Sequence, residues 1–234
     1  MYHTIFIMPG RKTPLVTGNY YHIYNRGVAK QPTFTNKTEC NRALELINYY
    51  RFANIKQRYS KFIALPSKEK SEIWQHLKRD NKIYVQIISF VLMPNHFHFC
   101  LKQVVDNGIS RFVSQFTNSY TRYINTIKNR PGTLFQGRFK AILVDSDEQL
   151  IHLTRYHHLN PYTDGLQTNI KDLITNTYSS LPDYISEKTR DFIDTSDVLA
   201  YFKNRLAYKK FVMSHRDYQK KLGKIKHLLF EKVS

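Results

Sequence analysis

Residues 90–101 read FVLMPNHFHFCL, and this stretch decides how the chain folds. The two apolar runs on either side of its Pro-Asn pair predict two antiparallel strands joined by a tight turn. Side chains alternate between the faces of a strand, so His96 and His98 project from one face while Phe97 points into the other. Two imidazoles that stand side by side are a ready pair of metal ligands.

Apolar patterns outside this stretch predict the rest of the sheet and its helices. Aromatic and β-branched runs indicate strands, and apolar residues spaced three and four apart indicate helices. We expect strands at 19–27, 83–92, 96–102 and 139–144, and helices at 39–52, 109–128 and 147–159. This order predicts an α+β fold in which helices pack on one face of an antiparallel sheet. The polar, basic stretch 54–82, with a short helix around Trp74, resembles an insertion.

The helix predicted at 147–159 carries a second pair of functional candidates. Its start matches a capping box, with Ser146 as the N-cap. Tyr156 and Asn160 are four residues apart, so a phenol and a carboxamide share one helix face. Pro161 disfavours helical geometry at Asn160, so we expect Asn160 at the helix end and only approximate alignment of the two side chains. With a metal and the two histidines, this pair could make a nucleophilic site.

The charge balance points to a polyanion as partner. The 234 residues hold 36 Lys and Arg against 18 Asp and Glu, a formal net charge of +18. Nucleic acid is the leading candidate. A membrane surface is the competing one, but no stretch approaches the roughly 20 apolar residues of a membrane span. Residues 1–17 also lack the apolar segment of a secretory signal, so we expect an intracellular protein with no membrane partner.

The C-terminal part differs in composition from the rest. Beyond Pro182 the apolar signal weakens, and residues 201–234 carry ten Lys or Arg against two acids, a net charge of about +8. We therefore predict a catalytic domain at 1–182 and a basic, helical extension at 183–234.

Each of these signals also has an ordinary structural interpretation. A histidine on an apolar strand usually packs in the core, and ten histidines make a chance His-x-His pair common. Tyrosine is abundant too, with 17 in the chain, and Tyr120 and Tyr123 fall on the apolar stripe of their helix. Taken alone, neither the histidine pair nor Tyr156 shows whether these residues form a functional site or pack in the core.

Four short segments are each weak evidence for a function, but they form a specific signal when they are taken together and in order. They are YHIYNRG at 21–27, VLMPNHFH at 91–98, GTLFQGRFK at 132–140 and RYHHLNP at 155–161. As an ordered set they resemble the REP-associated tyrosine transposases. These are single-tyrosine members of the HUH nuclease superfamily, related to small single-strand insertion-sequence transposases. The resemblance covers residues 19–182 and includes a later Tyr178-Ser179-Ser180 motif.

The resemblance implies a fold, a metal and a reaction. The fold is a ferredoxin-like sheet with the histidines on a central strand, and with the tyrosine helix packed beside them. His96, His98 and Asn160 would bind a divalent cation, Mg²⁺ or Mn²⁺. Tyr156 would attack a DNA phosphodiester, leaving a 5′-phosphotyrosine and a free 3′-hydroxyl. Because the covalent link conserves the energy of the phosphodiester, another 3′-hydroxyl can reverse the step, which makes the enzyme a strand transferase.

The implied partner is single-stranded or hairpin DNA, which places the protein in the cytoplasm on the nucleoid. Arg26, Arg122, Arg138 and Lys140 are the candidates for phosphate contacts. His152, His157 and His158, which flank the tyrosine, are candidates for a ligand or supporting role at the metal. A homodimer is compatible with this class, and the sequence leaves the oligomeric state open.

Two other classes of function compete with this interpretation. One is a domesticated, non-catalytic nucleic-acid-binding protein that keeps the fold and the charge; intact His96, His98, Tyr156 and Asn160 argue against it. The other is a replication or conjugation initiator with the same chemistry. Such initiators are usually joined to a helicase or a longer relaxase region, and this sequence has no phosphate-loop motif.

Overall fold

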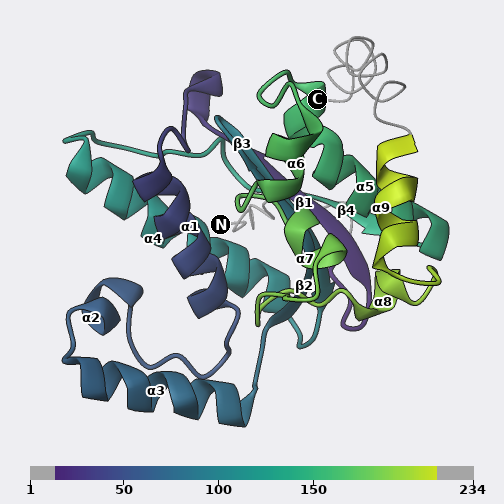
Figure 1. Cartoon of the computed structure of the whole chain (residues 1–234). Helices are drawn as coiled ribbons and strands as arrows, with labels where there is room; N and C mark the ends of the chain where they lie inside the picture. The colour runs from purple at the N-terminus through teal and green to yellow at the C-terminus, as the bar shows by residue number, and fades with distance from the viewer. Residues whose placement is uncertain (1–13, 215–234) are drawn as a thin grey trace, which may run out of the picture.

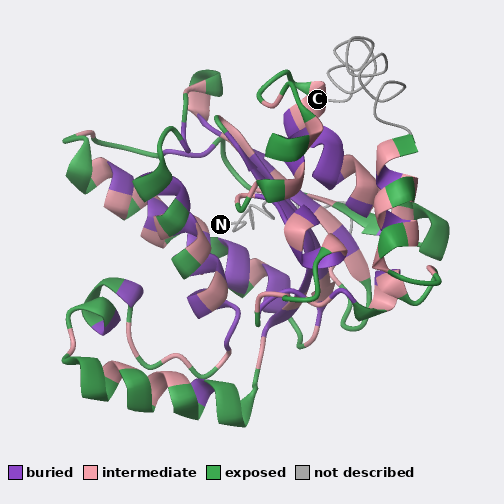
Figure 2. Ribbon diagram, viewed as in Figure 1, coloured by how far each residue is buried: buried purple, intermediate pink, exposed green. Residues whose placement is uncertain are grey.

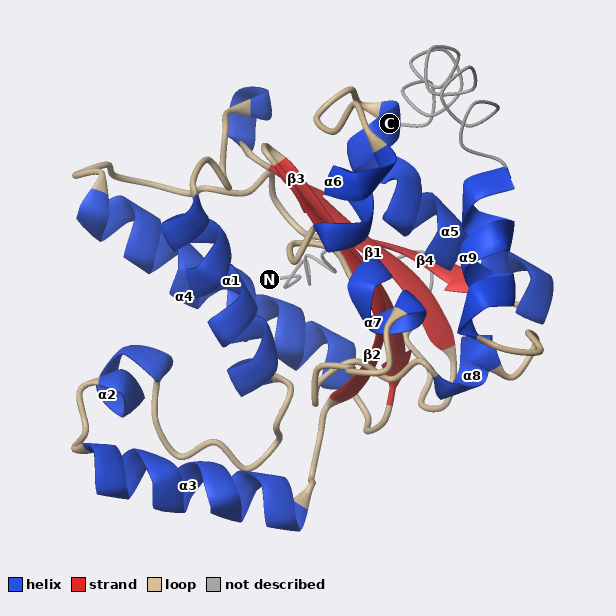
Figure 3. Cartoon of the chain, in the orientation of Figure 1, coloured by secondary structure: helices blue, strands red, loops and turns tan. Residues whose placement is uncertain are grey.

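A four-stranded antiparallel sheet forms the centre of the molecule (Figures 1 and 3). The computed structural model describes residues 14–214. The strands are β1 (Tyr20–Arg26), β2 (Val85–Met93), β3 (His96–Gln103) and β4 (Lys140–Val144). Their order in the sheet is β2-β3-β1-β4, so β3 and β1 are the two central strands. The α+β class and the antiparallel sheet are therefore confirmed.

Helices follow and separate these strands along the chain. The longer ones are α1 (Lys37–Tyr50), α3 (Ser67–Asp80), α4 (Gly108–Ile127), α5 (Asp147–Thr163) and α9 (Arg205–Ser214). The shorter ones are α2 (Tyr59–Ile63), α6 (Ile170–Thr175), α7 (Leu181–Ile185) and α8 (Ser196–Leu199). The helices predicted at 39–52 and 109–128 correspond to α1 and α4 within a residue or two.

One face of the sheet is aromatic and is covered by α1 and α4. Phe97 and Phe99 of β3 contact Phe116 of α4, with ring centroids 5.4 and 5.7 Å apart. These three side chains are fully buried. Burial of one such ring stabilises the fold by about 1.5–3 kcal/mol. The alternation of residues along β3 thus fixes which face becomes the main core.

The opposite face carries the histidines, and α5 lies across it, on the far side of the sheet from α4 (Figure 1). Helices therefore cover both faces, whereas the sequence predicted them on one. The reason is that part of the histidine face, over β2 and β3, is also apolar: Val91, Met93 and Cys100 lie on it and are buried. Such a surface needs a cover, and Figure 2 shows that β2 and β3 are the mostly buried strands between the two helical layers.

Helix α5 continues past the end predicted at residue 159. It includes Pro161 and ends at Thr163. Pro161 has no N–H to donate to the His157 carbonyl, so the helix loses that one hydrogen bond. The turn is held by the Asp164 N–H, which donates to the Asn160 carbonyl at 3.0 Å, and by the Thr163 hydroxyl, which donates to the Leu159 carbonyl at 2.8 Å. Asn160 therefore keeps helical geometry.

The stretch predicted as an insertion forms α2 and α3 beside the end of α1, away from the sheet (Figure 1). Helix α3 is longer than the short helix predicted around Trp74. Trp74 anchors it by packing on Tyr49 and Phe52, with ring centroids 6.4 and 5.8 Å apart. The 54–82 stretch is thus docked on α1 through a small aromatic cluster.

Part of the predicted C-terminal extension packs on α5. Tyr208 and Val212 of α9 are fully buried, and Phe211 is half-buried. Residues 215–234 lie outside the described part of the chain, and the domain division after residue 182 stays a prediction. Within residues 14–214, no helix is both long and apolar enough to cross a membrane.

Candidate active site

His96 begins β3, directly after the hairpin turn. Its Nδ1 lies 2.6 Å from Oδ1 of Asn95, which holds the ring through one nitrogen. Burial, helped by the nearby Arg26 guanidinium, lowers the pKa of His96 to about 4. The imidazole is therefore neutral at pH 7, the state in which it can ligate a metal.

His98 lies one step further along the same face and is buried. Its ring centroid is 4.9 Å from that of His96. Its Nδ1 lies 2.8 Å from Nε2 of His22, a residue of the neighbouring strand β1. His22 lies in the YHIYNRG stretch, but it was not among the predicted site residues, although alternation along 19–27 places it on one face with Tyr24 and Arg26.

His157 adds another buried imidazole, from the helix that lies across this face of the sheet. It follows Tyr156 on α5, and its Nδ1 lies 2.8 Å from Oγ of Ser89 on β2. One ring nitrogen each from His22, His98 and His157 lie within 4.8 Å of one another. The structure thus gathers a compact histidine cluster that shares only His98 with the predicted ligand set.

Tyr156 projects from α5 toward the same histidines. Its ring lies edge-on to His98 with centroids 5.6 Å apart, and 6.3 Å from that of His22. Burial raises the pKa of Tyr156, and a hydrogen bond with the Asn160 side chain opposes the shift. The phenol is neutral at pH 7 and is supported by the amide one turn away. Tyr156 and Asn160 therefore share a face more closely than their position before a proline suggested.

The donors present on this face fit a divalent cation. His96 is a neutral nitrogen donor, His98 is buried beside it, and the buried Asn160 can offer a hard carboxamide oxygen. Two imidazoles and an oxygen suit Mn²⁺ and other divalent ions, and the oxygen suits Mg²⁺. The assignment of His96, His98 and Asn160 as the ligands stays a prediction.

The four arginines and lysines predicted to contact DNA divide into two groups. Arg26 pairs with His96 and Lys140 pairs with Tyr24 in the strand registers, so both lie on the histidine face. Arg138 is exposed in the loop just before Lys140. Arg122 lies elsewhere, on α4, which covers the opposite face of the sheet.

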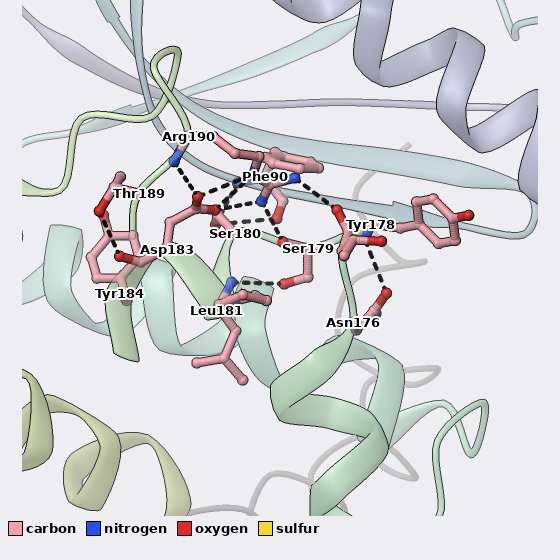
Figure 4. A network of polar contacts seen from close by, with 12 residues as sticks. Phe90, Asn176, Tyr178, Ser179, Ser180, Leu181, Asp183, Tyr184, Thr189 and Arg190 are labelled. Atoms are coloured by element: carbon pink, nitrogen blue, oxygen red, sulfur yellow. Dashed lines mark hydrogen bonds and ion pairs between the residues drawn. The ribbon is translucent and has the colours of Figure 1, made fainter. Parts of the chain in front are cut away.

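A polar network joins β2 to the segment that follows α6, and Figure 4 shows its part around Phe90, Ser180 and Arg190. The segment from Asn176 to Arg190 folds back against β2, where the Leu92 N–H donates to the Tyr178 carbonyl at 2.8 Å. Ser180 Oγ accepts from the Phe90 N–H at 3.0 Å and lies 2.8 Å from Nε2 of His158 on α5. Ser180 thus connects the strand beside the histidines to the helix that bears Tyr156.

We expect Ser180→Ala to lower the free energy of unfolding by about 1–3 kcal/mol, because it leaves the buried Nε2 of His158 without its partner. Urea denaturation measures this value. Ser71→Ala, on the exposed surface of α3, is the matched control and should change it by less than about 0.5 kcal/mol. Equal effects of the two substitutions would show that the Ser180 hydrogen bonds do not hold α5.

Comparison with known proteins agrees with this arrangement. The family model described as IS200-like transposase matches residues 16–158, a range that contains His96, His98 and Tyr156 and ends before Asn160. The fold resembles a solved structure described as a REP-associated tyrosine transposase bound to a REP hairpin. The two are 12% identical, with a TM-score of 0.54 over 82% of this chain and 93% of that one. No curated protein sequence matches the chain.

Proposed function

The chain belongs to the family of IS200-like transposases and is therefore a DNA transposase in its general activity, and we propose that it cuts and rejoins single-stranded or hairpin DNA through Tyr156. The substrates would be the ends of repetitive or insertion elements. This chemistry would take place in the cytoplasm, on the nucleoid. The observation that carries the proposal is the approach of the Tyr156 ring from α5 to His98 on β3.

The proposed reaction exchanges one phosphate ester for another. The Tyr156 oxygen forms a bond to phosphorus, the bond from phosphorus to the 3′ oxygen breaks, and that oxygen leaves as a 3′-hydroxyl after taking up a proton. The downstream strand stays on the protein as a 5′-phosphotyrosine. The phenolic proton must leave during attack, because the pKa of Tyr156 is raised by burial. The Asn160 hydrogen bond favours the charged form and so assists this loss.

Several residues of this face would support attack. Arg26 and Lys140 can hold the phosphates of the bound strand. A divalent cation bound by His96, His98 and Asn160 would polarise the scissile phosphate and stabilise its developing charge. His22 would hold the His98 ring through Nδ1 and orient its other nitrogen toward that cation.

Polarity of the cut tests this proposal. Hairpin oligonucleotides with unpaired flanks are labelled at either end and incubated with the protein and Mg²⁺ or Mn²⁺. We expect the 3′ label to migrate with denatured protein and the 5′ label to be released on a shorter strand. Tight binding of both oligonucleotides without cleavage would instead favour the non-catalytic nucleic-acid-binding protein.

A further inference from the structure

A groove with basic side chains along its walls lies on the side of α4 that faces away from the sheet. Its volume is about 830 Å³, and α1, residues 55–63 and α4 line it. We call it the α1–α4 groove. Its walls come from the 54–82 stretch, whose role the sequence left open, and from the polar stripe of α4. The α1–α4 layer and the sheet separate it from Tyr156.

Five basic side chains line the α1–α4 groove, and none of the described residues lining it is acidic. They are Arg42, Lys56, Arg58, Arg111 and Arg122. The last four are exposed, and in residues 14–214 none of those four forms an ion pair with a carboxylate. Exposed cations that converge without counter-charges are the electrostatic mark of a polyanion site.

The donors on α4 follow one line along the groove. Arg111, Ser114, Asn118 and Arg122 are spaced three and four apart, so they share one helix face. The eleven helical steps from Arg111 to Arg122 span about 16.5 Å at 1.5 Å per step. Phosphates of one DNA strand recur about every 3.4 Å along the duplex axis, so this line matches a short run of consecutive phosphates.

The aromatic residues of the groove favour a duplex over a single strand. Proteins that hold single strands present aromatic faces on which bases stack. Here the Arg42 guanidinium lies over both Tyr59 and Tyr123, 5.2 and 4.8 Å from the ring centroids. Tyr59 is also buried. The groove therefore offers charge and hydrogen-bond donors to a phosphate backbone. Arg42 covers the tyrosine rings on which bases of a single strand would stack.

We propose that the α1–α4 groove binds the phosphate backbone of the double-stranded stem of a DNA hairpin. The inference rests on the proposed function for the identity of the nucleic acid. It assigns a role to Arg122 away from the histidine face and makes residues 55–63 part of a DNA interface. Stem binding and strand cutting would then occupy opposite sides of the sheet.

The test removes one charge from each wall of the groove. Arg58→Gln with Arg122→Gln is compared with Lys68→Gln and Lys171→Gln, two exposed lysines outside the groove that give the same change in net charge. Fluorescence anisotropy measures the Kd for a DNA hairpin and for a single strand of equal length, at several salt concentrations. We expect the groove variant to bind the hairpin at least about tenfold more weakly and the single strand less than about twofold more weakly. The log-log salt slope for the hairpin should fall by about 0.9 for each phosphate that the variant no longer neutralises.

Three results would overturn the inference. One is equal hairpin binding by the groove variant and the lysine control. Another is an equal decrease in affinity for the hairpin and the single strand in the groove variant. The third is tighter binding of an RNA hairpin than of the DNA hairpin, with the same dependence on Arg58 and Arg122. Melting temperatures within about 2 °C of the unmutated protein, expected for exposed positions, ensure that the comparison reports binding.

Refutation of stem binding by the α1–α4 groove and refutation of the proposed cutting activity would rest on different results. If the unmutated protein forms no covalent adduct but the groove variant loses hairpin affinity, the cutting activity is refuted and the groove stands. If the adduct forms and the groove variant binds like the lysine control, the groove is refuted and the cutting activity stands.

Discussion

Tyr156→Phe is expected to abolish covalent capture of a labelled hairpin oligonucleotide, a loss of at least about a thousandfold in the rate of adduct formation. The substitution removes only the oxygen that would attack phosphorus and leaves the ring beside His98. DNA affinity should change little, because the basic side chains that hold phosphates remain. Denaturing gels measure the adduct, and anisotropy measures binding. Tyr162→Phe, on the same helix, is the matched control and should still form the adduct.

A denaturant-resistant adduct on the Tyr156→Phe protein would refute this nucleophile. The next residue to test would be Tyr24, whose ring centroid lies 5.8 Å from that of His98. The two tyrosines that the sequence placed on the apolar stripe of their helix are excluded by position. Tyr120 is fully buried and Tyr123 is half-buried, both on α4 across the sheet.

His96→Ala and His98→Ala are each expected to suppress cleavage by at least about a hundredfold, because each removes a predicted ligand of the cation. Chelation with EDTA should reproduce the loss in the unmutated protein, and added Mg²⁺ or Mn²⁺ should restore cleavage. Gel assays of the cut strand measure both effects. His76→Ala is the matched control, since His76 is an exposed histidine on α3, and it should cleave normally.

Undiminished cleavage in excess EDTA would contradict a metal-dependent mechanism. The histidine cluster adds a sharper comparison. If the cation is held by His22, His98 and His157 instead, His157→Ala would suppress cleavage and His96→Ala would not. Metal added at millimolar concentration should restore cleavage if a substitution only weakens metal binding. It should not restore cleavage if the substitution unfolds the protein.

Local sequence patterns predicted much of the sheet because alternation along a strand determines its faces. The pair His96 and His98 lies together on one face of β3, as the FVLMPNHFHFCL stretch indicated. His22 was missed for a different reason. Its position beside His98 depends on β1 lying next to β3, and strand order is a property of the whole fold.

Positions that depend on packing between elements were the least predictable. The pattern of α4 showed that Arg122 is on the polar side of a helix, but not that the helix covers the face opposite the histidines. The extension of α5 past Pro161 was missed because the hydrogen bonds that hold its last turn come from Thr163 and Asp164. Local propensity therefore placed the helices along the sequence and left their arrangement open.

The most direct test of the central claim is the mass of the peptide that carries DNA. The adduct is trimmed with nuclease and digested with trypsin, which cuts after Arg155 and places Tyr156 at the start of peptide 156–171. We predict a nucleotide joined through its 5′ phosphate to this peptide, with fragmentation assigning it to Tyr156 rather than Tyr162. A nucleotide on peptide 13–26, which contains Tyr24, or on Tyr162, or joined through a 3′ phosphate, would contradict the account.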